Sequence, residues 1–285
     1  MPAELAYRIL NVFAVPGDRL SGNPLCVFED GRGLDGRRMQ ALARQFNLSE
    51  TTFLLPADRP DATAAVRIFT PGTEMPFAGH PTLGTAHVVR ALTGCGDRVV
   101  LSMRSGPVEV RAAGDRWTLS PPRPAAWRAP ATPAAELAAM LGLPADVVGS
   151  PLWVDTGVEQ LLVPVRSVEA LRAALPDPAL LARRARSPGG ESMAWVFAGA
   201  GDGEIEARGF FSEHGAAIED PATGSACANL GGWLLATGAA LPARRRVRQG
   251  AQVGRPSILE LEVDPERRIH VGGEVVELGR GTIRI

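Results

Sequence analysis

The pattern of hydrophobic and polar positions predicts many short strands and few helices. Alternation typical of a half-buried strand covers residues 7–15, and apolar residues fall at helical spacing over 39–46. Two more short helices are expected in the second half of the chain, between strands. The remaining strands are predicted at 25–28, 52–55, 65–70, 98–103, 108–112, 117–120, 152–155, 160–165, 193–198 and 204–211.

Two further helices, predicted at 82–92 and 223–236, are apolar nearly all round. Gly94 ends the first, and the second stops at Gly238. A helix on the surface of a protein normally carries a charged face. Because these two lack one, we expect strands to enclose each of them. The pattern therefore predicts an α+β fold with two pseudo-symmetric domains, each a curved, mostly antiparallel sheet wrapped around a central helix.

The segment that leads into each apolar helix is repeated. His80–Ala86 (HPTLGTA) returns 140 residues later as Asp220–Ala226 (DPATGSA), and upstream Arg67–Thr70 is answered by Arg208–Phe211. The offset is close to half of the 285 residues, so the chain reads as a duplication. The first copy of the motif begins with an imidazole and the second with a carboxylate.

The duplication and the length favour two domains of roughly 140 residues each. Five prolines between Pro121 and Pro133 indicate a linker. We expect an N-terminal domain of residues 1–120, completed by the C-terminal strand at about 276–285, and a C-terminal domain of residues 121–275.

Composition narrows the class of protein. The net charge of −1 gives no field that would attract nucleic acid or an anionic membrane, and no apolar run approaches the roughly 20 residues of a membrane helix. The basic runs at 183–186 and 244–248 are interpreted as solvated faces, the second near a helix C-terminus. Three scattered cysteines and an N-terminus without signal-peptide features favour the cytoplasm.

All 30 basic residues are arginine. Without a lysine amine the chain cannot form a Schiff base, which excludes pyridoxal-phosphate and lysine-aldolase chemistry, and it has no Walker A lysine. The four histidines and three cysteines lack the spacing of a transition-metal site. The composition therefore excludes these lysine-dependent classes and disfavours a dedicated transition-metal site.

The starts of the two apolar helices are candidate binding positions. Unpaired N–H groups and the positive end of the helix dipole favour a carboxylate there, without any help from a cationic side chain. Gly84, Thr85, Gly224 and Ser225 would line such a pocket. Taken singly, however, Asp before Pro at a helix start is also an ordinary capping arrangement. The unlike pair, His80 and Asp220, is what favours proton-transfer chemistry over capping.

Longer motifs resemble those of the phenazine-biosynthesis PhzF-like family, whose members share the diaminopimelate epimerase fold. The likeness spans nearly the whole chain. It rests on Gly22–Pro24, Asn47–Phe53 (NLSETTF), Phe69–Pro71, Pro76–Ala86 (PFAGHPTLGTA), Glu219–Ala226 (EDPATGSA) and Gly254–Ser257 (GRPS).

The resemblance implies a cofactor-independent isomerase or epimerase, usually a homodimer, with its site between two pseudo-symmetric domains. Glu50, which spacing alone would leave as an ordinary solvated carboxylate, becomes the principal general acid and base. His80 and Asp220 become its partners. The implied substrate-binding residues are Asn23, Gly79, Gly84, Thr85, Gly224 and Ser225. The expected reaction moves a proton on a small, carboxylate-bearing, cyclic or unsaturated metabolite.

Two alternatives stay open. A non-catalytic protein that binds small carboxylates could keep the same pocket. Epimerisation through two thiols is disfavoured, because thiol-dependent relatives of this fold carry cysteine where this chain has His80 and Asp220, and Cys227 reads as a core residue. Ser212-Glu213 departs from the family pattern, and His214 in the same loop could assist catalysis.

Overall fold

The computed structural model describes residues 4–213 and 215–285, and the chain divides into two compact units. Unit 1 comprises Met1–Pro122 together with Gly272–Ile285, and unit 2 comprises Arg123–Val271. His214, which the sequence offers as a possible assistant in catalysis, lies outside the described residues.

Unit 1 contains a mixed sheet and two helices, α1 (Gly36–Phe46) and α2 (Gly79–Thr93). Most of its strand pairs are antiparallel, whereas β2–β3 and β4–β6 are parallel. The strands are β1 (Glu4–Ala14), β2 (Asn23–Phe28), β3 (Glu50–Leu55), β4 (Ala64–Phe69), β5 (Glu74–Met75), β6 (Arg98–Met103), β7 (Gly106–Ala113), β8 (Arg116–Leu119) and the long β17 (Ile269–Arg284), which belongs to unit 1 from Gly272 onward.

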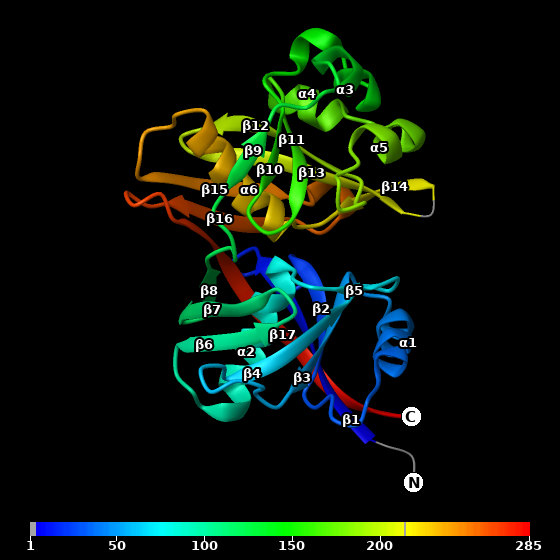
Figure 1. The fold of residues 1–285 in the computed structure, drawn as a ribbon, viewed down its shortest axis with the longest axis vertical. Coiled ribbons are helices and arrows are strands. Elements are labelled where there is room, and N and C mark those ends of the chain that lie inside the picture. The colour runs from blue at the N-terminus through cyan, green and yellow to red at the C-terminus, as the bar shows by residue number, and fades with distance from the viewer. Residues whose placement is uncertain (1–3, 214) are drawn as a thin grey trace. The chain divides into compact units, whose positions relative to one another are not determined.

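Helix α2 is the centre of unit 1, as Figure 1 shows. It packs against β1, β2, β3, β6, β7 and β8, and its residues from Gly79 to Ala86 are all buried. The helix lacks a charged face because nearly every side of it contacts a strand. It ends where the sequence predicts: Gly94 adopts the left-handed conformation (φ 67°), and its N–H bonds to the carbonyl oxygen of Arg90.

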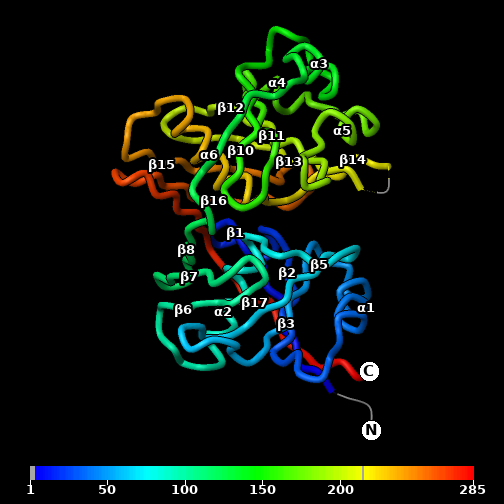
Figure 2. The backbone as a smooth tube through the Cα atoms, viewed as in Figure 1, coloured from blue at the N-terminus to red at the C-terminus, as the bar shows by residue number. Residues whose placement is uncertain are grey.

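The first and last strands of unit 1 form an antiparallel pair. Glu4 lies opposite Arg284, and the pairing continues to Ala14 opposite Glu274. The blue and red ends of the tube therefore run side by side in Figure 2. The sequence pattern predicts only the last ten or so residues of this strand, whereas β17 starts at Ile269.

Unit 2 is built around α6 (Gly224–Ala236), which packs against β9, β10, β11 and β16. Its other helical segments are α3 (Ala134–Met140), η1 (Ala145–Val147), α4 (Val168–Ala173), α5 (Pro178–Arg184) and η2 (Ala251–Val253). Its strands are β9 (Ala126–Arg128), β10 (Leu152–Asp155), β11 (Glu159–Pro164), β12 (Met193–Gly201), β13 (Glu204–Glu213), β14 (Ala216–Asp220), β15 (Ala243–Gln249) and β16 (Ser257–Val263).

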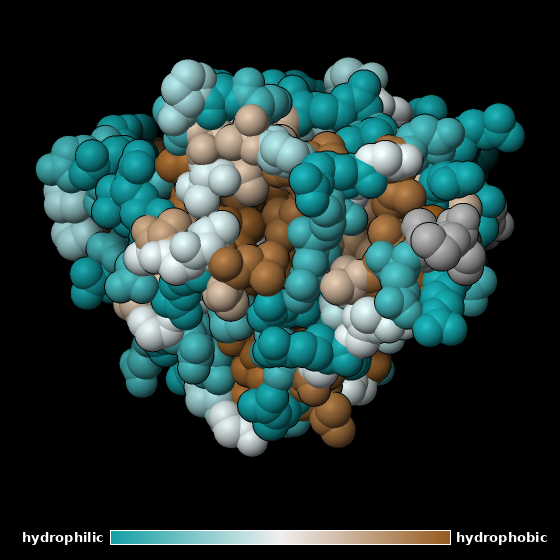
Figure 3. Space-filling model, turned by 90° about the horizontal axis from the view of Figure 1, so that it is seen from below, coloured by the Kyte–Doolittle hydropathy of each residue, from teal (hydrophilic) through white to brown (hydrophobic). Residues whose placement is uncertain are grey.

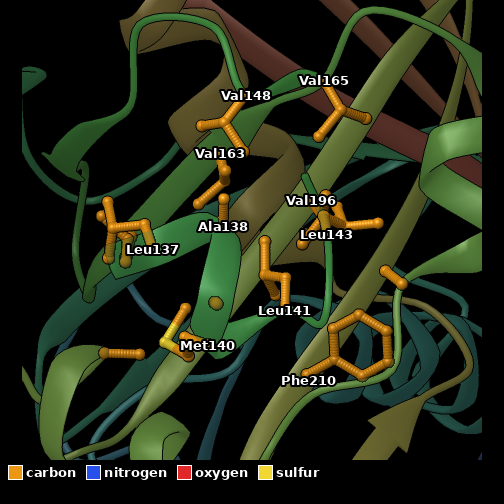
Figure 4. Packing of buried hydrophobic residues seen from close by; sticks show 14 of the residues in the cluster. Leu137, Ala138, Met140, Leu141, Leu143, Val148, Val163, Val165, Val196 and Phe210 are labelled. Atoms are coloured by element: carbon orange, nitrogen blue, oxygen red, sulfur yellow. The ribbon is translucent and has the colours of Figure 1, made fainter. Parts of the chain in front are cut away.

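An apolar core in unit 2 fixes the helices that follow the linker. Leu137, Met140 and Leu141 from α3 and its C-terminal end pack near Val163 and Phe210 of the sheet (Figure 4). The cluster also takes in Leu171 of α4 and Leu181 of α5. Burial of this apolar surface is the main force that holds the three short helices on the strands.

Two segments differ from their sequence interpretation. The proline-rich stretch contains β9, which pairs antiparallel with β10, so it supplies a strand as well as a connection. The basic run at 244–248 is a strand, β15, rather than a segment near a helix end. Its exposed arginines form ion pairs with glutamates of neighbouring strands, Arg244 with Glu262 and Arg248 with Glu204. The run is therefore the solvated side of a strand.

The space-filling view in Figure 3 shows one face, on which hydrophobic side chains gather near the centre and hydrophilic ones surround them. Large exposed apolar side chains do occur, with Leu20 72% and Leu175 80% exposed. Single residues of this kind are common on protein surfaces. They indicate no particular binding site.

Candidate active site

Glu50 and His80 lie together in unit 1. Glu50 is the first residue of β3, and His80 is the second residue of α2. Oε2 of Glu50 lies 3.1 Å from Nε2 of His80, and the two side chains are only 15% and 6% exposed. The two atoms are at ion-pair distance but lack the angles of a hydrogen bond. A carboxyl group and an imidazole that the sequence separates by 30 residues are thus brought into contact.

The end of α1 and the start of β3 place the Glu50 side chain. Helix α1 stops at Asn47, which adopts the left-handed conformation (φ 51°) and donates its N–H to the carbonyl oxygen of Ala43. Only Leu48 and Ser49 separate this cap from the strand. In the parallel β2–β3 pair, Glu50 then lies opposite Leu25. The short connection leaves the carboxyl group beside the start of β2.

His80 is a neutral imidazole at pH 7, because burial lowers its pKa to about 3. A hydrogen bond with the backbone of Pro24 opposes this shift only in part. Proline has no N–H, so the ring must donate to its carbonyl oxygen. The contact with Glu50 is consequently not a pair of opposite charges, and His80 does not neutralise that carboxyl group.

Asn23 lies at the same place, directly before the proline that His80 contacts. It is fully buried at the start of β2 and stands opposite Val12. The preceding Gly22 has φ 85°, and a Cβ there would lie 2.7 Å from the carbonyl oxygen of Val12. Only glycine fits this turn. The structure therefore brings the predicted residues Asn23, Glu50 and His80 together with Gly79, the first residue of α2.

Gly84 and Thr85 occupy the buried surface of α2. A Cβ at Gly84 would lie 2.5 Å from Cδ2 of Leu25, so the absence of a side chain lets the helix approach the sheet. The hydroxyls of Thr85 and Thr52 form a buried hydrogen bond of 2.9 Å. Both residues pack α2 against the sheet. Their substrate-binding role stays a prediction.

In unit 2, Asp220 is the last residue of β14 and lies before α6 rather than on it. The N-cap position of α6 belongs to Thr223, whose hydroxyl donates to Oδ2 of Asp220 at 2.7 Å. The carboxylate is therefore not in the N-cap position that the capping interpretation assumes. Neither N-cap residue, Ala78 of α2 nor Thr223 of α6, forms a side-chain capping bond among the described residues.

Ser225 lies in the first turn of α6, next to Gly224, and is held by buried amides. Nε2 of Gln160 donates to its hydroxyl oxygen at 2.9 Å, and Nδ2 of Asn229 donates to Oε1 of the same Gln160 at 2.9 Å. The Ser225 hydroxyl thus accepts one bond, which leaves its own proton to donate elsewhere.

The sequence interpretation missed two polar residues beside this helix start, Gln160 and Gln249. Both are almost fully buried, at 3% and 2% exposure, on strands whose inward positions are otherwise apolar. A buried amide is normally retained only where its hydrogen bonds are satisfied. For Gln160, the available signal was a glutamine within a predicted apolar strand, whereas Gln249 lies in β15, which the sequence pattern did not predict.

A family model described as phenazine biosynthesis-like protein, PhzC-PhzF, matches residues 11–281. The chain belongs to this PhzC-PhzF family. A curated relative from Pasteurella multocida, named an uncharacterised isomerase, is 35% identical, with 99% of this chain and 95% of the relative covered. The trans-2,3-dihydro-3-hydroxyanthranilate isomerase of Pseudomonas aeruginosa is 38% identical, with 88% of this chain and 87% of the relative covered.

Solved structures of two other proteins have the same fold. A predicted epimerase from Pseudomonas aeruginosa superimposes with a TM-score of 0.80 at 32% identity, covering 98% of this chain and 99% of that one. A hydroxyproline epimerase from Agrobacterium vitis, at 12% identity, TM-score 0.64 and coverage of 99% and 93%, shares the fold alone. These similarities confirm the expected diaminopimelate epimerase-like fold.

The two buried cysteines of this PhzC-PhzF protein do not suit a thiol mechanism. Cys227 is fully buried inside α6, and burial raises the pKa of its thiol. Cys26 in β2 is buried in the same way.

Among residues 4–213 and 215–285 there is no group of three or more metal-ligating side chains. No helix in these residues is long and apolar enough to span a membrane.

Proposed function

We propose that this protein is a cofactor-independent isomerase that moves a proton on a small carboxylate-bearing metabolite, cyclic or unsaturated. The observation that carries the proposal is the buried contact between Glu50 and the neutral His80. Relatives named trans-2,3-dihydro-3-hydroxyanthranilate isomerase, at 36–38% identity, support the reaction class. Such a substrate has the carboxylate and the activated C–H bond that the proposed chemistry needs.

In this proposal the Glu50 carboxylate removes a proton from carbon and returns the same proton to another carbon. The electron pair of the broken C–H bond moves through the unsaturated system, so no oxidant, reductant or second substrate is consumed. General acid-base help of this kind contributes roughly 100- to 10,000-fold to the rate. Low exposure of Glu50 slows exchange of the carried proton with water.

His80 serves in this scheme as a neutral orienting group. Its single N–H is donated to the carbonyl oxygen of Pro24, which fixes the ring. The other nitrogen, Nε2, faces the Glu50 carboxyl group as an acceptor, available when that group carries the proton. A charged imidazole at this distance would hold the carboxylate as an ion pair and weaken it as a base. A neutral ring leaves the basicity of Glu50 available for catalysis.

The remaining assignments follow from the family likeness. Asp220 is the third catalytic partner, and the substrate-binding set is Asn23, Gly79, Gly84, Thr85, Gly224 and Ser225. We further propose the homodimer and the cytoplasmic location that the family and the cysteine usage imply.

Proton exchange tests the reaction. The protein is incubated in D2O with trans-2,3-dihydro-3-hydroxyanthranilate. NMR follows formation of the isomer, and mass spectrometry measures how much of the carried proton exchanges with deuterium. The wild type is expected to isomerise the compound, and Glu50→Gln to lose at least 1,000-fold in rate while still binding it. Glu109→Gln, a partly exposed glutamate of the same unit, is the matched control and keeps full activity.

Isomerisation that persists in Glu50→Gln would show that another group carries the proton. The rival function, a protein that only binds small carboxylates, predicts a different outcome. In that case the compound raises the melting temperature of the wild type, yet no isomer of the compound forms.

A further inference from the structure

Three buried or nearly buried side chains, Trp195, Gln249 and Thr223, form a chain of hydrogen bonds that ends on Asp220. We infer that these three are positioning residues that hold the Asp220 carboxylate ionised and in one orientation. Only the role of the Asp220 carboxylate toward a substrate rests on the proposed function. The chain of bonds lies wholly within unit 2.

The first link fixes which way the Gln249 amide points. Its Oε1 receives the indole N–H of Trp195 at 3.0 Å and the backbone N–H of Thr223 at 3.3 Å. Both groups can only donate. The oxygen of the amide must therefore face them, which leaves Nε2 to donate on the opposite side.

The second link fixes the direction of the Thr223 hydroxyl. Nε2 of Gln249 donates to Oγ1 of Thr223 at 2.9 Å and to the backbone oxygen of Asp220 at 2.8 Å. The hydroxyl oxygen thus accepts, so its single proton must be donated elsewhere. The acceptor is Oδ2 of Asp220, 2.7 Å away.

The direction of the chain cannot reverse, because an indole nitrogen does not accept a hydrogen bond. Oδ2 of Asp220 is consequently held as an acceptor. A hydrogen bond donated to a carboxylate favours its charged form and opposes its protonation. Asp220 is thus suited to accept an N–H or O–H group of a substrate, and poorly suited to carry the reacting proton, which agrees with Glu50 in that role.

Packing leaves these groups no other arrangement. Trp195 is fully buried, and Gln249 and Thr223 are 2% and 7% exposed. A Cβ at Gly209, which stands opposite Asp220 in the β13–β14 pair, would lie 2.7 Å from Oγ1 of Thr223. Glycine at this position leaves room for the hydroxyl.

Nearby charges on the flanking strands point away from the chain of bonds. Arg208 and Glu219 pair with each other at 2.7 Å. Each is adjacent in sequence to Gly209 or Asp220, so it projects from the opposite face of the β13–β14 pair. That face also carries Phe210, which shares its core cluster with Leu181 of α5.

Two other arginines lie on neighbouring segments. Arg184, at the end of α5, pairs with Glu136 of α3. The backbone of Arg255 lies near the motif turn, because a Cβ at Gly250 would meet the backbone oxygens of both Pro221 and Arg255. The Thr223 hydroxyl acts on Asp220 directly, as a hydrogen-bond donor at 2.7 Å.

An NMR titration of the protein without substrate tests the inference. Protein labelled with 13C at aspartate Cγ is titrated with acid, and the Asp220 signal is assigned by its loss in Asp220→Asn. Thr223→Val removes the donor with little change of shape, and we expect its Asp220 midpoint to rise by about one pH unit. Thr223→Ser retains the hydroxyl and should keep the wild-type midpoint. Thr237→Val, at the other end of α6, is the control.

An unchanged midpoint in folded Thr223→Val would overturn the inference, as would an equal shift in Thr223→Ser. If Thr223→Val does not fold, Thr223→Ala provides the second test. It removes the hydroxyl donor and adds no charge beside Asp220. Its Asp220 midpoint should also rise.

Turnover of trans-2,3-dihydro-3-hydroxyanthranilate separates this inference from the proposed function. With an active wild type, we expect Thr223→Val to lose about tenfold in kcat/KM and Thr223→Ser to recover most of it. A wild type that shows no turnover but has the expected titrations would contradict the proposed function alone.

Discussion

Nε2 of His80 lies 3.1 Å from Oε2 of Glu50, although burial keeps the imidazole neutral at pH 7. A neutral histidine beside a carboxyl group has a measurable consequence for stability as well as for catalysis, because the folded protein resists a proton that the unfolded chain accepts.

The pH dependence of folding should reveal His80. The pKa of its imidazole is about 3 in the folded protein, below the ordinary value of 6.5. Between these values the unfolded chain binds the extra proton, so stability falls as the pH falls through 6.5 toward 3. From pH 7 to pH 5 we expect His80 to account for a loss of about 2 kcal/mol. Urea denaturation at both pH values measures it.

His80→Asn is the matched variant, since it removes the titrating ring and keeps a polar side chain. It should lose about 2 kcal/mol less than the wild type over the same pH interval. Equal losses in the two proteins would mean that His80 is charged in the folded state.

Gly84→Ala should destabilise unit 1 through overpacking. The added Cβ would lie 2.5 Å from Cδ2 of Leu25 and 2.9 Å from Cγ2 of Val12. Overpacking in a core costs about 1–3 kcal/mol, and denaturant unfolding measures the change. Gly279→Ala, with no atom within 4 Å of the new Cβ, should stay within about 0.5 kcal/mol of the wild type. A neutral Gly84→Ala would show that α2 can move away from the sheet.

The buried bond between Thr52 and Thr85 predicts a non-additive pair of mutations. Thr85→Val leaves the Thr52 hydroxyl unsatisfied in the core and should cost about 1–3 kcal/mol. Adding Thr52→Val removes the second polar group, so the double variant should be more stable than either single one. Unfolding free energies of the four proteins complete the cycle. A substrate-binding role for Thr85 predicts that activity stays low even in the stable double variant.

Alkylation should distinguish the three cysteines. Cys95 is exposed, whereas Cys26 and Cys227 are buried and their thiols have raised pKa values. Iodoacetamide should therefore add one label to the native protein and none to Cys95→Ser, as intact-mass spectra would show. Catalytic activity should survive the labelling. Loss of activity in step with modification of Cys227 would revive the mechanism through thiols.

Local signals explain what the sequence predicts well. The enclosed helix α2 and its end at Gly94 follow from an apolar surface and from a glycine in the left-handed conformation, both of which involve only neighbouring residues. Strand β15 was missed for a local reason too. Its inward Ala243, Val247 and Gln249 alternate with arginines, and the high charge hides the period of two.

The contacts of the site could not be predicted from local signals. Glu50 meets His80 because β2 and β3 pair in parallel and α2 starts beside Pro24, which is a matter of register between distant segments. Only the family resemblance singled out Glu50. Gln249 was missed because a lone glutamine in a strand has no chemical signature until its partners are known.

The pairing of the first and last strands determines the order in which the chain can fold during synthesis. Unit 2 is continuous from Arg123 to Val271 and can form once it has left the ribosome, while unit 1 must wait for Gly272–Ile285. Until then β1 exposes an unpaired edge that could recruit other chains. A protein truncated before β17 should therefore aggregate through unit 1 during expression, even though it still contains both Glu50 and His80.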